Sequence, residues 1–168
     1  IVGKPGAGKS SIGSELAKLI GGTNLSLGGF MREVLQIPDP HIGIDKNIVY
    51  EELQKYLQEQ KASDTLVLDC HPYPEDALKA LQTFVHQPSV ALWAVVHVQA
   101  DDSVALNRLK KQVRPGQAVE DRLKYFNDNQ HFIDMLMEYP LAIEVENNVD
   151  SDDARTIKKI AEEISRQL

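Results

Sequence analysis

The most constraining feature of this sequence is a glycine-rich loop, which reads GKPGAGKS over residues 3–10 and fits G-x-x-x-x-G-K-[ST] at every fixed position. Its glycines allow backbone angles that turn successive N–H groups into one concavity. The helix expected after the loop adds a partial positive charge, and Lys9 adds a full one. The pattern therefore predicts a loop that cages a polyphosphate. The expected contacts are Gly3, Pro5, Gly6, Ala7, Gly8, Lys9, Ser10 and Ser11.

Two side chains near this loop are suited to a divalent cation. Ser10 follows Lys9 directly, and Asp69 ends the apolar run TLVLD at residues 65–69, which is typical of a buried parallel strand. Hydroxyl and carboxylate oxygens are the kind of ligand that Mg²⁺ prefers. We therefore expect Ser10 and Asp69 to hold Mg²⁺ or its water beside a nucleoside triphosphate.

Helix and strand patterns alternate along the rest of the chain. Helices are expected over residues 9–20, from about 28 to the prolines at 38 and 40, and over 48–57, 75–85, 103–111, 119–137 and 151–167, the last capped by Ser151. Buried strands are expected at 65–69, 91–98 and 141–145 and before Gly3, where the sequence shows only Ile1 and Val2. This order predicts an α/β fold in three layers, a doubly wound parallel five-stranded sheet with helices on both faces.

Size and charge limit the partners of the chain. With 168 residues it has the size of one compact domain, which we assign to residues 1–168. A net charge of −7 opposes association with nucleic acid, and no apolar run is long enough to cross a bilayer. Cys70 is the single cysteine and we see no secretory signal, so we expect a cytoplasmic protein with no membrane partner.

Several segments resemble the adenylate kinase family of nucleoside monophosphate kinases, which are P-loop kinases. The loop is similar to that family's GxPGxGKGT. The segment LSLGGFMRE at 25–33 resembles ISTGDLLR and matches it at Gly28 and Arg32. The segment LVLDCHPYPEDA at 66–77 resembles LLDGFPRTxxQA and matches it at Asp69 and Pro72.

The resemblance extends over nearly the whole chain. VQADDSVALNRL at 98–109 resembles VPDEVLIERL, and RPGQAVEDRLKYF at 114–126 resembles RxDDxxExxxxRLxxY with three residues fewer between its arginines. The resemblance implies a P-loop NTPase-like fold, ATP and Mg²⁺, a monomer, and transfer of the γ-phosphoryl group to a nucleoside monophosphate. It also implies an acceptor-binding helical insertion at 28–60 and a short lid at 109–120.

By position in the family's motifs, each arginine receives an expected role. Gly28 and Arg32 would bind the acceptor, because a guanidinium stays charged and grips phosphate at two points. The residues expected to act on the donor and the transferring group are Lys9, Arg108, Arg114 and Arg122.

The acceptor side departs from the family pattern. Leu27, Cys70, Tyr73 and Ala77 stand where that family has Thr, Gly, Arg and Gln. Three functions therefore stay open. The first is a nucleoside monophosphate kinase, the second is a P-loop kinase of another small phosphoryl acceptor, and the third is a catalytically degenerate nucleotide-binding module.

Overall fold

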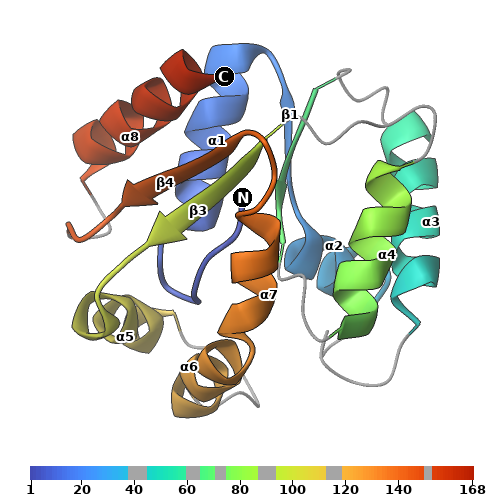
Figure 1. The fold of residues 1–168 in the computed structure, drawn as a ribbon, viewed down its shortest axis with the longest axis horizontal. Helices are drawn as coiled ribbons and strands as arrows, with labels where there is room; N and C mark the ends of the chain where they lie inside the picture. Colours follow the sequence, from blue (N-terminus) through green and yellow to red (C-terminus); the bar gives the residue numbers. More distant parts are fainter. Residues whose placement is uncertain (38–44, 60–64, 71–74, 87–93, 113–118, 150–152) are drawn as a thin grey trace.

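A computed structural model of the chain describes residues 1–37, 45–59, 65–70, 75–86, 94–112, 119–149 and 153–168. Helices and strands alternate along these ranges, as Figure 1 shows. The strands are β1 (Thr23–Ser26), β2 (Leu66–Asp69), β3 (Val95–Gln99) and β4 (Ala142–Glu146). The helices are α1 (Lys9–Ile20), α2 (Leu27–Glu33), α3 (Lys46–Glu59), α4 (Glu75–Val85), α5 (Asp102–Lys111), α6 (Val119–Asp128), α7 (Gln130–Leu136) and α8 (Ala154–Gln167).

The strands form two parallel pairs, β1 with β2 and β3 with β4. The first two residues of the chain lie between the pairs. Val2 bridges His97 in parallel and exchanges hydrogen bonds of 2.8 and 2.9 Å with β3, while the Cys70 amide donates to the Ile1 carbonyl at 3.1 Å. The predicted five-stranded sheet is therefore not confirmed, since the described chain contains two two-stranded sheets that residues 1–2 connect.

Helices cover both faces of this β layer, as the sequence predicts for an α/β fold. On one face α1 and α8 lie side by side (Figure 1) and pack on apolar side chains such as Val96 and Val98. On the other face α2, α3, α4, α6 and α7 share a second core, in which Leu53 and Ile133 are fully buried. The apolar residues that these helices bury recur at the helical spacing seen in the sequence.

The predicted single helix over residues 119–137 is wrong. The structure has two helices there, α6 and α7, separated by Asn129 with φ −118° and ψ 15°. Asn and Asp side chains compete for backbone hydrogen bonds and favour helix ends, and three of them occur in sequence at 127–129. The break lets Phe126 and Phe132 both reach the core, where they are 2% and 8% exposed.

Other elements also differ from the expectation, and α2 ends at Glu33, before the prolines at 38 and 40. β1 was not expected, because its sequence TNLS carries no apolar run and only its pairing with β2 makes it a strand. The N-cap of α8 is Asp153, whose carboxylate accepts from the Arg155 amide at 3.0 Å, while Ser151 lies outside the described residues. By contrast, the expected end of α1 is confirmed at Gly21, which has φ +67°.

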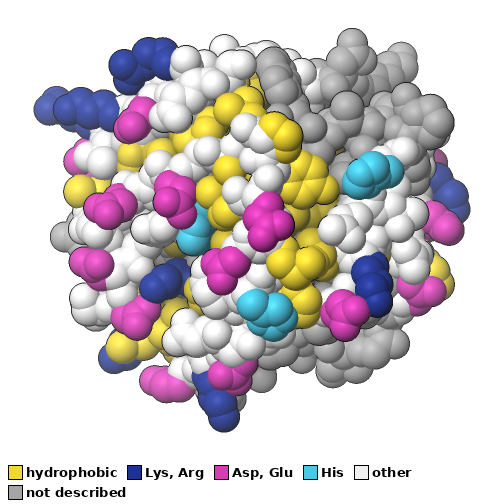
Figure 2. All heavy atoms as spheres, in the orientation of Figure 1, with side chains coloured by type: hydrophobic (Ala, Val, Ile, Leu, Met, Phe, Trp, Pro, Cys, Tyr) yellow, Lys and Arg dark blue, Asp and Glu magenta, His cyan; other side chains and the backbone are white. Residues whose placement is uncertain are grey.

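The surface of the described chain carries many acidic side chains. They are scattered over the face shown in Figure 2, in keeping with the net charge of −7. Among the helices that the structure describes, none combines the length and the apolar character needed to span a membrane.

Candidate functional site: a phosphate-binding loop at the carboxyl edge of the strands

The predicted phosphate-binding residues follow Val2 at the edge where the parallel strands end. In doubly wound folds ligands bind at this carboxyl edge. The residues Gly3, Pro5, Gly6, Ala7 and Gly8 form the loop, and Lys9, Ser10 and Ser11 form the first turn of α1. Asp69 ends β2 at the same edge, and Ser26, the last residue of β1, is its partner in the pairing register.

Gly6 and Gly8 are required by both the backbone angles and the packing of the loop. Gly6 has φ +81° and Gly8 has φ +90°, which other residues rarely adopt. A Cβ on Gly6 would lie 2.5 Å from the Ala105 carbonyl oxygen, and one on Gly8 would lie 2.4 Å from Nδ2 of Asn147. The loop thus packs closely against α5 and against the residue that follows β4.

The loop concentrates positive charge. Gly8 is the N-cap of α1, and as a glycine it has no side chain that could cap the helix, which leaves room for an anion at the helix start. Lys9 is only 5% exposed, and its ammonium donates to the carbonyl oxygens of Gly3 at 2.9 Å and Lys4 at 3.1 Å. These bonds hold the Lys9 charge against the loop, as an anion site requires.

Ser10 and Asp69 lie together, as the sequence predicts for a cation site. The Ser10 hydroxyl donates to Oδ2 of Asp69 at 2.5 Å. Asp69 is 6% exposed, and its other oxygen, Oδ1, is buried without a hydrogen-bond partner in the described chain. A buried, unsatisfied carboxylate oxygen beside a hydroxyl fits Mg²⁺ or its water, which would satisfy it.

Gly28 and Arg32 also lie together. They belong to α2, which begins directly after β1, and the Ser26 hydroxyl caps this helix by accepting from the Gly29 amide at 3.3 Å. A Cβ on Gly28 would lie 3.2 Å from Nη1 of Arg32, so the guanidinium lies over this glycine. Because Gly28 has no side chain, there is room for the half-buried guanidinium of Arg32 above it.

The three other predicted arginines are placed differently from one another. Arg108 is 4% exposed in α5, and its guanidinium donates to the carbonyl oxygens of Gly6 at 3.0 Å and Asn147 at 2.9 Å. Arg122 is half-buried in α6. Arg114 lies outside the described residues.

Sequence reasoning missed Asn147, which is 1% exposed and contacts the loop directly. Its Nδ2 donates to the Ala7 carbonyl oxygen at 2.8 Å, and its Oδ1 accepts from Nη2 of Arg108 at 3.1 Å. The available signal was its position, since a polar residue directly after a buried parallel strand lies at the edge where ligands bind.

A comparison with known families agrees with this site. The family described as an AAA domain matches residues 1–127, which include the loop, Ser10, Asp69 and Arg108. The chain belongs to this AAA domain family.

Relatives of this AAA domain chain include adenylate kinases. The adenylate kinase of Bartonella bacilliformis is 26% identical, and the match covers 83% of this chain and 78% of the relative. The adenylate kinase of Corynebacterium glutamicum is 23% identical, with 95% of this chain and 97% of the relative covered. The resemblance to a nucleoside monophosphate kinase-like P-loop family is confirmed.

Solved structures support the fold. Deoxyadenosine kinase from M. mycoides, solved with products dcmp and a flexible dcdp bound, matches with a TM-score of 0.55 at 15% identity and covers 99% of this chain and 97% of its own. This match identifies an α/β P-loop kinase fold with parallel strands. The AAA domain chain therefore has a P-loop kinase-like fold and is similar to adenylate kinases and to a deoxyadenosine kinase.

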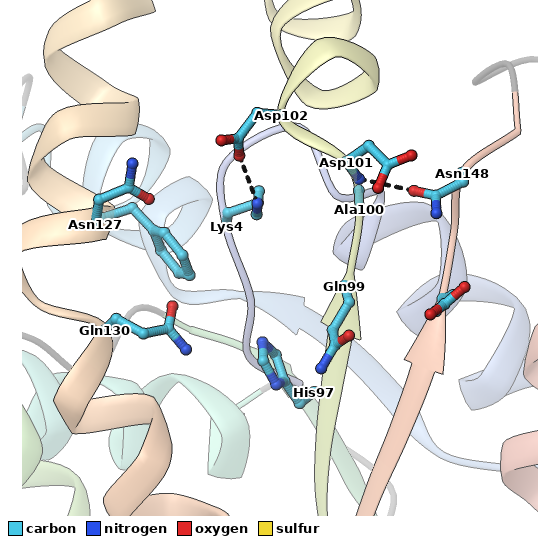
Figure 3. A pocket seen from close by; sticks show the side chains of 11 residues that line it. Lys4, His97, Gln99, Ala100, Asp101, Asp102, Asn127, Gln130 and Asn148 are labelled. Carbon is cyan, nitrogen blue, oxygen red and sulfur yellow. Dashed lines mark hydrogen bonds and ion pairs between the residues drawn. The ribbon is translucent and has the colours of Figure 1, made fainter.

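A polar hollow of about 310 Å³ adjoins the loop of this AAA domain chain. Figure 3 shows Lys4, His97 and Gln130 around it, and Lys4 forms an ion pair of 2.6 Å with Asp102. Burial lowers the pKa of His97, and Glu144, 3.4 Å away, partly offsets this effect. Asp101 and Glu146 also line the hollow, so with neutral His97 and the Lys4–Asp102 ion pair its net charge is negative and it is a poor second phosphate site.

Proposed function

We propose that this chain is a Mg²⁺-dependent phosphotransferase that moves the γ-phosphoryl group of ATP to a nucleoside monophosphate. The observation that carries the proposal is the loop itself, whose buried Lys9 lies at the start of α1 and next to the Ser10 and Asp69 pair. This arrangement supplies the positioning and the charge neutralisation on which phosphoryl transfer depends.

The ATP-binding side of the proposed enzyme consists of the loop and of Ser10 and Asp69, whose oxygens would bind Mg²⁺. The N–H groups at the start of α1 and Lys9 would bind the phosphates of ATP. Ser10 and Asp69 would hold Mg²⁺, which neutralises phosphate charge when it is bound. Asp69 is suited to this role because one of its oxygens is unsatisfied and buried.

The acceptor and lid assignments rest on position and charge. We assign residues 1–168 to one domain, with acceptor binding in 28–60, where Gly28 and Arg32 lie together, and a short lid in 109–120. Arg114 and Arg122 would neutralise the transferring group when the lid closes over ATP and excludes water. The proposal includes a cytoplasmic monomer that binds neither nucleic acid nor membrane.

One observation favours a second candidate, a P-loop kinase whose acceptor is another small molecule. Cys70 and Leu27 stand where the resembled family has Gly and Thr, and they are 4% and 8% exposed. Burial raises the pKa of the Cys70 thiol, so this residue stays neutral and acts as a small apolar side chain. An acceptor contact at this position would therefore differ from the one that the resembled family makes.

The proposed function is tested by a coupled assay for ADP with Mg·ATP and a panel of acceptors. The panel holds AMP, GMP, CMP, UMP, dAMP and dCMP, followed by nucleosides and sugars. Turnover of at least one monophosphate is expected. Turnover of a nucleoside or sugar alone would support the second candidate, and ATP binding without turnover of any acceptor would indicate a nucleotide-binding module.

Arg32→Ala tests the acceptor assignment. A charge-assisted hydrogen bond contributes about 1.5–3 kcal/mol, so its loss should raise the KM for the acceptor by about 10- to 150-fold. The KM for ATP should change by less than about twofold. Steady-state kinetics with each substrate varied in turn measures both values, and Arg155→Ala on the exposed side of α8 is the matched control. Equal increases in the two KM values would show that Arg32 does not serve the acceptor.

A further inference from the structure

We propose that Asn147 and Arg108 are positioning residues that hold the phosphate-binding loop in its anion-binding conformation. This inference deepens the proposed function and rests on it. The sequence suggested that Arg108 acts on the phosphates directly, whereas the described contacts of its guanidinium are with main-chain and amide oxygens around the loop.

Asn147 connects the loop to the end of the sheet. Its Nδ2 donates to the Ala7 carbonyl oxygen at 2.8 Å, and its backbone amide donates to the Gln99 carbonyl at 2.8 Å. The residue is 1% exposed, and its amide group lies where a side chain on Gly8 would otherwise be. The rigid edge of β3 and β4 thus reaches the loop through one buried side chain.

Arg108 bonds to the same structure from α5. Its Nη1 donates to the Gly6 carbonyl oxygen at 3.0 Å, and its Nη2 donates to Oδ1 of Asn147 at 3.1 Å and to the Val149 carbonyl oxygen. One guanidinium therefore links the loop, Asn147 and the chain that leaves β4. This is the planar, multidentate geometry that a lysine does not reproduce.

Peptide geometry explains how these contacts set the loop for an anion. In a trans peptide the C=O and the N–H point in opposite directions. When Asn147 holds the Ala7 carbonyl, the amide of Gly8 must point away from Asn147. The Gly6–Ala7 peptide is fixed at both ends, because Arg108 holds its carbonyl and its N–H donates to the Lys4 carbonyl at 3.1 Å.

Preorganisation has a specific consequence for binding. A loop whose amides are already oriented loses little conformational entropy when the phosphates bind. Its affinity for the phosphate chain is therefore higher than that of a mobile loop. Asn147 and Arg108 act on the loop carbonyls, and their loss should therefore weaken binding of the phosphate chain whatever base is attached to it.

The test compares Asn147→Ala with Asn148→Ala, a matched control at the next position, whose exposed side chain accepts from the Asp101 amide at 2.7 Å and makes no described bond to the loop. Titration calorimetry at 25 °C would measure the dissociation constants of Mg·ATP and of inorganic tripolyphosphate. Asn147→Ala should raise both constants about tenfold, or about 1.4 kcal/mol, and Asn148→Ala should change them less than twofold. Circular dichroism and thermal melts report whether each variant is folded.

A second variant keeps the test decisive if Asn147→Ala fails to fold. Arg108→Lys keeps the charge but cannot bond to Gly6 and Asn147 together, so it should also weaken tripolyphosphate binding at least about fivefold. In the kinase assay both variants should raise the KM for ATP and leave the KM for the acceptor unchanged, a split that a purely structural role would not produce.

The outcomes separate this inference from the proposed function. Folded variants that bind tripolyphosphate as tightly as the wild type would overturn the positioning role, as would a wild type that binds neither probe. If the wild type binds Mg·ATP but phosphorylates no acceptor, the proposed function fails, and the difference in dissociation constants still supports the positioning role.

Discussion

Lys9 carries a buried positive charge. The residue is 5% exposed, and its ammonium donates to two carbonyl oxygens of the loop. Lys9→Ala removes a positive charge from the proposed phosphate site, so ATP phosphotransfer should fall by at least about 100-fold. The fold should persist, because the lost hydrogen bonds, worth about 1.5–3 kcal/mol each, are partly offset by removal of a buried charge that is costly to desolvate.

A coupled assay and circular dichroism test this prediction. Lys18→Ala is the control, because Lys18 lies in the same helix and is exposed in an ion pair with Glu15. Wild-type activity in folded Lys9→Ala would contradict the assignment of the loop.

The buried hydroxyl of Tyr50 has no hydrogen-bond partner in the described chain, and the residue is 3% exposed. An unsatisfied buried polar group costs stability, so Tyr50→Phe should be neutral or raise the free energy of unfolding by about 1 kcal/mol. Burial raises the pKa of Tyr50 well above 10.0, so the wild type should lose stability as pH rises above about 10, where only the unfolded tyrosine ionises.

Urea denaturation of wild type and Tyr50→Phe at pH 7 and pH 10.5 measures this effect. The advantage of the variant should grow at the higher pH, and Tyr56→Phe at a half-buried position is the control. A loss of more than about 1 kcal/mol at pH 7 would show that the hydroxyl is bonded.

The sequence predicted which residues lie together where they belong to one local motif, while the roles of these residues stay predictions. Lys9, Ser10 and Gly8 belong to one motif, and the hydrogen bond from Ser10 in the first turn of α1 to Asp69 joins this motif to the end of β2. Asn147 was not predicted: its position after a buried strand marks the edge where ligands bind, but no local pattern marks its contact with Ala7, 140 residues away.

At the scale of elements, the packing of α8 on α1 should contribute strongly to stability. Ile164 in α8 is fully buried, and Ile164→Ala should cost about 2–5 kcal/mol through lost burial and a residual cavity. Leu19→Ala in α1 is the control, because Leu19 is 44% exposed, and it should cost about 0.5 kcal/mol or less. Urea denaturation measures both values. A cost below about 1 kcal/mol for Ile164→Ala would contradict the described packing.

Strong periodicity and capping residues decided which elements the sequence revealed. α1 was predicted from its apolar spacing and from Gly21, and α4 from a clear amphipathic pattern. β1 was missed because its four residues acquire their role through pairing with β2, which lies about 40 residues further along the chain. The join between α6 and α7 was missed because the apolar pattern continues through Asn129, and only the helix-ending polar residues mark the break.

At the scale of the whole molecule, the site gathers residues from both ends of the chain. Ile1 and Val2 hydrogen-bond to both strand pairs, and the loop that follows them contacts α5 and the residues after β4. A ligand in this loop would therefore touch a structure that depends on the complete fold. Ligand binding should stabilise the folded chain as a unit.

Mg·ATP should raise the melting temperature of the whole protein. A ligand that binds only the folded state at 100 times its Kd stabilises it by about 2.7 kcal/mol, which for a chain of this size corresponds to about 5–10 °C. Differential scanning fluorimetry measures the shift, and Lys9→Ala should abolish it.

Without Mg²⁺ the shift should shrink, because the Asp69 carboxylate repels the triphosphate when no cation lies between them. An equal shift in excess EDTA would exclude Ser10 and Asp69 as the cation site, and no shift at millimolar Mg·ATP would remove the basis for assigning nucleotide binding to this loop.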